Sequence, residues 1–203
     1  LVACVLSVCA DGQQPPPQAP PGFQPPQPAP AGPQLLHPMF QDHAVLQRDR
    51  PIRIYGETQP GAAVTVTLGT VSAQARAGAD GRWRATLPAM PAGGPYSLSA
   101  TANGETRTAE DVLLGDVFFC AGQSNMDLAV ERMDTAAEEL ADADRLGGVL
   151  RLLDFTACNP GNRALTAAEL AQLAEGRIYD GRWAVAGRAS VRTFSAIGWS
   201  VAR

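Results

Sequence analysis

The stretch DVFFCAGQSNMDLAVERM, residues 116–133, marks the point where the pattern of this sequence changes. Its apolar run, residues 117–121, ends at Gly122, and a polar Gln-Ser-Asn triplet follows. After that triplet, apolar residues recur at helical spacing up to the end of the stretch. The pattern therefore predicts a strand, a tight turn and then a helix, with Ser124 at the corner.

A continuous apolar strand that leads into a helix is typical of a doubly wound α/β sheet, in which sites form at the carboxyl ends of the strands. In such a sheet, the hydroxyl and backbone N–H of Ser124 would lie near the positive end of a helix that begins around Asn125. That position suits a developing oxyanion. The structural alternative is a helix cap, since Ser124 with Asp127 three residues on resembles a capping box. A second buried strand is expected within residues 148–155.

The sequence before Gly115 has a different pattern, with short segments in which apolar and polar residues alternate. Tight-turn dipeptides, Asp80-Gly81 and Asn103-Gly104, separate some of these segments. The pattern predicts a β-sandwich of immunoglobulin-like size over residues 35–114. Trp83 is expected in its core, with a sugar-stacking platform as the alternative. The predicted strands cover residues 52–56, 63–69, 82–87 and 96–102.

The first residues resemble an export signal. Residues 1–12 contain an apolar run with small residues suited to cleavage before Asp11, so we expect the protein to be exported, periplasmic or extracellular. A lipid-anchored Cys4 and an ordinary buried strand are the alternatives. Residues 13–34 are rich in proline and form a predicted linker or stalk, or a docking site for a proline-binding domain.

Composition excludes several classes of function. The formal net charge is -4, and no Lys/Arg-rich run suggests a nucleic acid as partner. All 16 basic residues are arginines, which removes lysine chemistry. With only two histidines and no metal-ligand spacing, neither a metal site nor a cofactor is expected. No transmembrane segment is expected either, and the oligomeric state is left open.

Three segments carry a resemblance to a known family: HPMFQDHAVLQRDRPIRIYGETQPGAAVTVTLG from residue 37, DGRWRATLPAMPAGGPYSL from residue 80 and DVLLGDVFFCAGQSNMDL from residue 111. Together they resemble the N-terminal half of the sialate O-acetylesterases. The resemblance is close over residues 36–130, loose over 131–190, and returns at residues 193–203. It implies a β-sandwich followed by a flavodoxin-like, SGNH-type α/β hydrolase domain, of which residues 115–203 would be the incomplete first part.

The resemblance also implies roles for the polar turn. Gly122-Gln123-Ser124-Asn125-Met126 is similar to the nucleophile motif of the family. Ser124 would be the catalytic nucleophile and its backbone N–H an oxyanion donor, while Gly122, Gln123 and Asn125 would shape the loop. The implied reaction removes acetyl groups from O-acetylated carbohydrates such as sialic acid, without a cofactor.

One part of the family's catalytic machinery is missing. Family members take their general base from a downstream Asp-x-x-His, and this sequence contains none. His37 and His43 are interpreted as structural or exposed. We therefore expect a fragment that folds well only in its sandwich and hydrolyses esters poorly, because a serine without a base is a weak nucleophile. The alternatives are a non-catalytic, carbohydrate-binding or decayed module, and an acetyl xylan-type esterase on the same scaffold.

Three smaller features complete the expectations. Cys120 is expected to pack as a small apolar residue, with a disulfide to Cys158 as the alternative. The acidic segment of residues 131–144 is expected to be a solvated helix face. A last helix is expected to be capped by Ser195, with its apolar residues Ile197, Val201 and Ala202 on one side.

Overall fold

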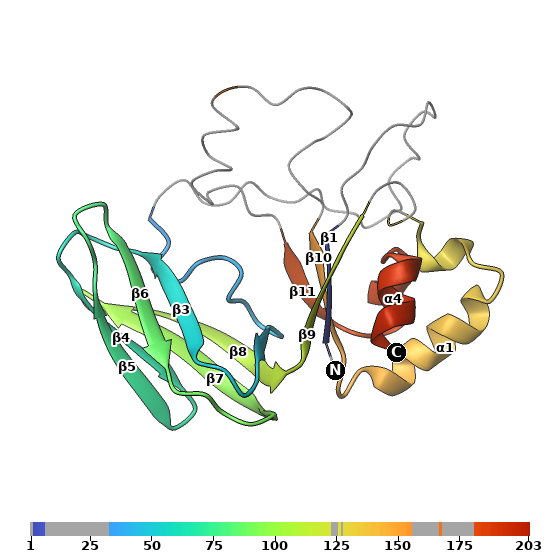
Figure 1. Cartoon of the computed structure of the whole chain (residues 1–203), viewed down its shortest axis with the longest axis horizontal. Helices are drawn as coiled ribbons and strands as arrows, with labels where there is room; N and C mark the ends of the chain where they lie inside the picture. Colours follow the sequence, from blue (N-terminus) through green and yellow to red (C-terminus); the bar gives the residue numbers. More distant parts are fainter. Residues whose placement is uncertain (1, 7–32, 123–125, 127, 156–166, 168–180) are drawn as a thin grey trace.

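The computed structural model of the chain describes residues 2–6, 33–122, 126, 128–155, 167 and 181–203. These residues form a mostly β structure with mixed sheets and a few short helices. Figure 1 shows a β region, residues 33–115, next to a second region in which a smaller sheet is covered by helices. The predicted β content is thus confirmed, while the finer assignment, a sandwich joined to an α/β hydrolase domain, stays a prediction.

The β region contains a five-stranded sheet and a two-stranded sheet. The larger sheet has the order β2-β8-β7-β4-β5, in which β2 and β8 are parallel and the other neighbours are antiparallel. The smaller sheet is the antiparallel pair β3–β6. The strands are β2 (Val45–Gln47), β3 (Ile52–Glu57), β4 (Ala63–Leu68), β5 (Val71–Arg76), β6 (Arg82–Leu87), β7 (Gly93–Ala102) and β8 (Glu105–Gly115). Each of the four predicted strands overlaps one of them.

Alternation of side chains gives this region its core. In β6, Trp83, Ala85 and Leu87 are buried, and the residues between them are exposed. The same alternation in β3 and β4 directs their apolar residues into one shared hydrophobic cluster between the two sheets. Trp83 is 3% exposed, which confirms it as a core residue.

The tight turns form where the sequence predicts them. Asn103 and Gly104 connect β7 to β8, and both have positive φ, 52° and 79°, as a two-residue hairpin turn requires. Gly81, before β6, has a φ of 80°, and a Cβ there would lie 2.6 Å from the carbonyl oxygen of Thr58. These glycines are therefore required by backbone geometry and by close approach.

The second region contains a four-stranded sheet with the order β11-β10-β1-β9. The strands β9 (Val117–Ala121), β1 (Val2–Leu6) and β10 (Arg151–Phe155) are parallel, and β11 (Arg182–Val185) is antiparallel to β10. Leu6 lies opposite both Ala121 and Phe155, so the three parallel strands end at one edge of the sheet. The two strands predicted here, at residues 117–121 and within 148–155, are confirmed.

Each face of this sheet packs in part against other elements, although Phe118 and Phe119 of β9 stay exposed. Leu153 and Trp183 belong to the hydrophobic cluster of the β region, whereas Leu152 packs into a second cluster together with the helices. Figure 1 shows the sheet between the β region and the helices. The helical elements are η2 (Val130–Arg132), α1 (Ala136–Leu146), α3 (Arg188–Arg192) and α4 (Ala196–Ala202).

The N-terminal segment lies in the middle of this sheet. Val2–Leu6 pairs with β9 on one side and with β10 on the other, which is the buried-strand alternative left open by the sequence. Its role as an export signal stays a prediction. Residues 7–32, which include most of the predicted linker, lie outside the described residues.

The continuous helix predicted from near Asn125 does not form in the described residues: Met126 lies in a 3-10 turn, but Leu128 and Ala129 are not helical. Ala129 forms a β-bridge with Ser195, and two backbone hydrogen bonds flank it: Ala196 N to Leu128 O at 2.7 Å and Val130 N to Phe194 O at 3.0 Å. These backbone groups pair with a distant segment, so they cannot close helical turns. A 3-10 turn, η2, comes next, and the first α-helix, α1, begins only at Ala136.

Two expectations about helical faces also need correction. Ser195 does cap α4, since its Oγ accepts a hydrogen bond from Gly198 N at 3.2 Å. The buried face of α4 is formed by Ala196, Trp199 and Ala202, however, while Ile197 and Val201 are exposed. In α1, Glu139 is only 3% exposed, so the acidic segment is not solvated throughout.

Candidate active site

The predicted site begins where β9 ends. Gly122 directly follows Ala121 at the edge where the parallel strands terminate. A Cβ on Gly122 would lie 2.6 Å from Cγ and 3.5 Å from Sδ of Met126, whose side chain is almost fully buried. The two ends of the predicted turn are therefore in contact, and only glycine fits at residue 122 unless Met126 moves.

The central residues of the predicted site, Gln123, Ser124 and Asn125, lie outside the described residues, as does Asp127. Their roles stay predictions. The chain packs on both sides of the turn: Val117 of β9 packs before it, and Met126 and Val130 pack after it in the cluster that also contains Trp199. The correction to the helix has a chemical consequence, since no α-helix among the described residues begins close after the turn to supply a positive helix end.

His37 is held within the β region. Its Nδ1 accepts a hydrogen bond from Met39 N at 3.1 Å, and its ring centroid lies 4.9 Å from that of Tyr55. Tyr55 is in turn half-buried, and burial raises the pKa of its hydroxyl. The contacts of His37 thus agree with its interpretation as a structural residue.

His43 forms a cluster with Asp111 and Arg151. His43 Nδ1 lies 2.7 Å from Asp111 Oδ2, and Arg151 donates to the same oxygen at 3.0 Å. The hydrogen bond with His43 and the nearby Arg151 guanidinium lower the pKa of Asp111, although partial burial opposes them. Arg151 is at the amino end of β10, about 13 Å along the strand from the edge that carries Gly122. The cluster is therefore remote from Gly122, where the predicted turn begins.

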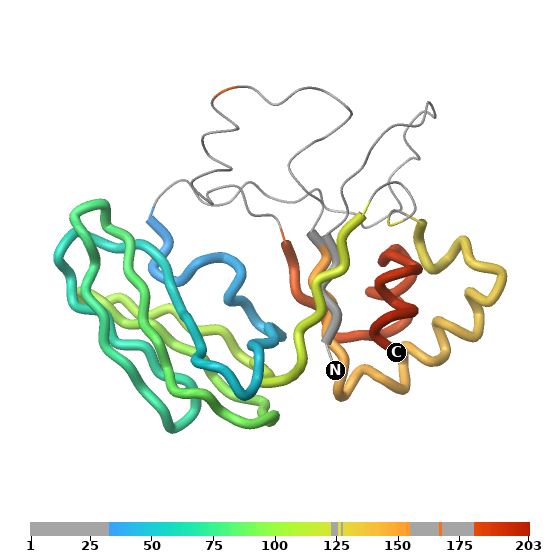
Figure 2. Tube along the Cα trace, viewed as in Figure 1, coloured from blue at the N-terminus to red at the C-terminus, as the bar shows by residue number. Residues whose placement is uncertain are grey.

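The segment that follows His37 joins the β region to the second sheet. Met39 O accepts a hydrogen bond from Trp183 Nε1 at 3.0 Å, and Gln41 Nε2 donates to Gly181 O at 2.7 Å. Figure 2 shows this blue segment running beside the red-orange strand β11. The segment thus fixes β11, whose amino end lies at the same edge of the sheet as Gly122.

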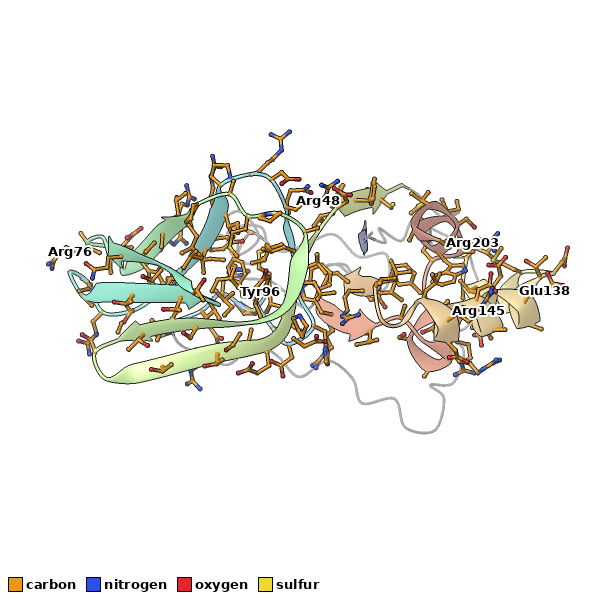
Figure 3. The ribbon with its side chains drawn as sticks, turned by 90° about the horizontal axis from the view of Figure 1, so that it is seen from below. Arg48, Arg76, Tyr96, Glu138, Arg145 and Arg203 are labelled. Carbon is orange, nitrogen blue, oxygen red and sulfur yellow. The ribbon has the colours of Figure 1, made fainter. Side chains whose placement is uncertain are left out.

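A second set of contacts fixes the start of β9. Gln47 Oε1 accepts from Val117 N at 3.0 Å, and Arg48 binds both carboxylate oxygens of Asp116 at 3.0 and 3.2 Å. In Figure 3, Arg48 lies where the two regions meet. Sequence reasoning missed these contacts, although residues 37–48 belong to one of the segments that carry the family resemblance.

Other kinds of site find no support in the described part of the chain. It contains no group of three or more His, Cys, Asp or Glu residues that could hold a metal ion. Within the same residues, no helix is long and apolar enough to cross a membrane. Cys120 is a free thiol whose pKa is raised by burial, and Cys158 lies outside the described residues.

Comparison with known proteins finds acetylesterases that are similar to part of this chain. It is 37% identical over 99 residues to a sialate O-acetylesterase of Rattus norvegicus, and 38% identical over 100 residues to that of Homo sapiens. A solved structure, that of a carbohydrate acetylesterase from Xanthomonas citri, matches with a TM-score of 0.65 and 31% identity. No family model matches the chain.

The extent of these matches is uneven. The sequence matches cover 44% of this chain but only 18% of the rat protein and 19% of the human protein. The structural match covers 83% of this chain and 36% of the bacterial enzyme. The chain is thus a partial homologue of the sialate O-acetylesterases and shares its fold with part of a carbohydrate acetylesterase.

Proposed function

We propose that this chain is the N-terminal part of a carbohydrate O-acetylesterase that removes acetyl groups from O-acetylated sugars such as sialic acid. The observation that carries the proposal is the position of Gly122, which follows a parallel strand and approaches Met126 so closely that a Cβ would require Met126 to move. Nucleophilic serines at such sharp strand-end turns serve several families of hydrolase. The likeness to a carbohydrate acetylesterase over 83% of the chain supports the same reaction.

In the proposed mechanism, the Oγ of Ser124 attacks the acetyl carbonyl, and the sugar hydroxyl leaves with a proton. Water then attacks the acyl-enzyme, releases acetate and restores the serine. Because no α-helix begins close after the turn among the described residues, we assign oxyanion stabilisation to backbone N–H groups of the turn, that of Ser124 among them. Gln123 and Asn125 shape the loop.

The reaction also needs a general base. The 203 residues contain no Asp-x-x-His. His43 is hydrogen-bonded to Asp111, at the opposite end of the parallel strands from Gly122. The proposal therefore requires a base from outside these residues. It also includes the finer fold assignment, an immunoglobulin-like sandwich joined to an SGNH-type hydrolase domain, and an exported location.

The experiment measures acetate release from O-acetylated sialic acid and from acetylated xylan by the product of the complete reading frame. Ser124→Ala should reduce kcat by about 10³-fold or more, while the exposed Ser72→Ala should leave the rate unchanged. The ratio of the two substrates decides between a sialate and a xylan esterase. Equal rates for Ser124→Ala and the unchanged protein would contradict the proposal.

A fluorophosphonate probe adds a second readout on the 203-residue chain itself. Because this chain contains no Asp-x-x-His, we expect labelling of Ser124 to be much slower than in the complete protein. Robust Ser124-dependent hydrolysis by the 203 residues alone would show that a base lies within them. Absence of labelling in both forms would favour a non-catalytic binding module.

A further inference from the structure

The two outer faces of the β region differ in charge. On the five-stranded sheet, hydroxyl-bearing residues lie opposite one another across three strands, and two of them, Thr101 and Thr106, are 2.9 Å apart at their Oγ1 atoms. The rows are Thr65, Thr101 and Thr106, and then Thr67, Ser99 and Thr108. This face is therefore mostly neutral and polar, although Arg76 of β5 and Glu110 of β8 lie on the same side of the sheet.

The outer face of the two-stranded sheet is basic instead. We call it the arginine face, and its residues are Arg53, Tyr55 and Glu57 of β3 and Arg82, Arg84 and Thr86 of β6. Arg82 pairs with Glu57 at 3.5 Å. Neither Arg53 nor Arg84 has a carboxylate within ion-pair distance among the described residues. Two positive charges thus remain uncompensated on a chain whose formal net charge is -4.

The strand register brings these two charges together around one ring. Tyr55 lies directly opposite Arg84, and Arg53 lies opposite Thr86, so Arg53 is the diagonal neighbour of Arg84. Such diagonal pairs have their Cβ atoms roughly 7–8 Å apart, a span that two guanidinium groups can close around one anion. Both arginine side chains are exposed, and Tyr55 is half-buried between them.

The hydroxyl of Tyr55 does not neutralise either arginine. It donates to Met39 Sδ at 2.6 Å, and burial raises its pKa, so the phenol stays uncharged at neutral pH. The ring is fixed by Phe40, with centroids 5.1 Å apart in an edge-on arrangement. The face therefore offers two fork-shaped cationic donors beside a rigid aromatic ring.

We propose that the arginine face binds a carboxylate-bearing sugar, with Arg53 and Arg84 holding the carboxylate and Tyr55 contacting the ring. Guanidinium groups match the planar geometry of a carboxylate, and aromatic rings pack against the apolar faces of sugars. The choice of a sugar as the carrier of the anion rests on the proposed function. Met39 links the face to the second region, because it contacts Tyr55 through Sδ and Trp183 through its carbonyl oxygen.

The test uses unacetylated sialyllactose as the probe, so it does not depend on any hydrolysis. Binding is measured by titration calorimetry or by saturation-transfer NMR, with lactose as the neutral control and acetate as the control for a bare anion. We expect sialyllactose to bind at least about tenfold more tightly than lactose or acetate, since only it combines the charge with the ring.

The variant Arg53→Gln/Arg84→Gln should weaken sialyllactose binding about tenfold or more. The matched control is Arg76→Gln, an exposed arginine at the far end of the β region in Figure 3, which should bind normally. Circular dichroism checks that each variant is folded. Equal weakening in both variants, equal binding of lactose, or no binding of sialyllactose would overturn the proposal. Binding that persists in a protein without esterase activity would leave this inference intact and refute only the proposed function.

Discussion

The β region and the second region differ in how completely they bury their apolar side chains. All seven exposed large apolar residues of the described chain belong to the second region: Phe118, Phe119, Leu128, Val149, Val185, Ile197 and Val201. In the β region the large apolar side chains are buried or partly buried, in one cluster that two residues of the second sheet also join.

This difference shows which region completes its own hydrophobic core. Antiparallel strands in the β region can present a polar face to water, so two sheets suffice to complete a core. The parallel strands of the second region are apolar on both faces, and β9, at the end of the sheet, leaves Phe119 65% exposed. The second region therefore leaves large apolar side chains on its surface, which the β region does not.

The same substitution should have a much larger effect in the β region than in the second region. Ile54 in β3 is fully buried, so Ile54→Ala should lower the free energy of unfolding by about 2–5 kcal/mol. Ile197 in α4 is 42% exposed, so Ile197→Ala should change it by less than about 0.5 kcal/mol. Urea titrations followed by circular dichroism measure both values. Similar losses at the two sites would remove the contrast between the regions.

The second region also contains one well-buried polar cluster. Glu139 accepts from Trp199 Nε1 at 2.8 Å and pairs with Arg203 at 2.7 Å. Glu139→Ala leaves the buried indole N–H without its acceptor, so we expect a loss of about 1–3 kcal/mol and a red shift of Trp199 fluorescence. Glu138→Ala, at the exposed neighbouring position, is the matched control. If both variants unfold at the same urea concentration, the carboxylate of Glu139 does not hold α4 against α1.

The junction between the regions should respond to acid through Asp111. The folded pKa of Asp111 lies below its unfolded value of about 3.9. Its ionic contacts therefore stabilise the protein above that value, and the gain is lost as pH falls through the folded pKa. Asp111→Asn tolerates the same positive φ of 54° and cannot ionise. We expect it to be less stable than the unchanged protein at pH 6 and to converge with it near pH 2.

Urea midpoints at several pH values test this expectation. Curves that stay parallel across the whole range would show that the cluster of His43, Asp111 and Arg151 does not contribute through the charge of Asp111.

The smallest effect on stability is expected at the end of the second sheet. Phe119→Ser should change the free energy of unfolding by only about 0.5 kcal/mol, because the ring is mostly exposed. It should nevertheless reduce self-association, since exposed apolar patches promote association. Sedimentation velocity at several concentrations measures this, with Ile197→Ser as the control on the helical side. Unchanged self-association would show that β9 does not mediate contacts between copies of the chain.

Local patterns predicted the β region well, because alternation, turn dipeptides and the burial of Trp83 all depend on near neighbours. The strand β9 and the position of Gly122 were predictable for the same reason. The helix after Met126 was not, since the backbone of Leu128 and Val130 pairs with residues some 65 positions later. Glu139 was misjudged because its partners, Trp199 and Arg203, are equally distant in sequence. Contacts between residues that are distant in the sequence leave no periodic pattern from which they could be predicted.

The central position of Val2–Leu6 in the sheet bears on what cleavage of an export signal would do to the second region. Its backbone groups pair with β9 and β10 at once, whereas an export signal is removed from the mature protein. If these residues are cleaved off as an export signal, they cannot remain in the sheet of the mature protein. If cleavage before Asp11 occurs, β9 and β10 must each lose a partner and approach by about 5 Å to pair directly. A new pairing of β9 with β10 would then have to follow the removal of the first strand.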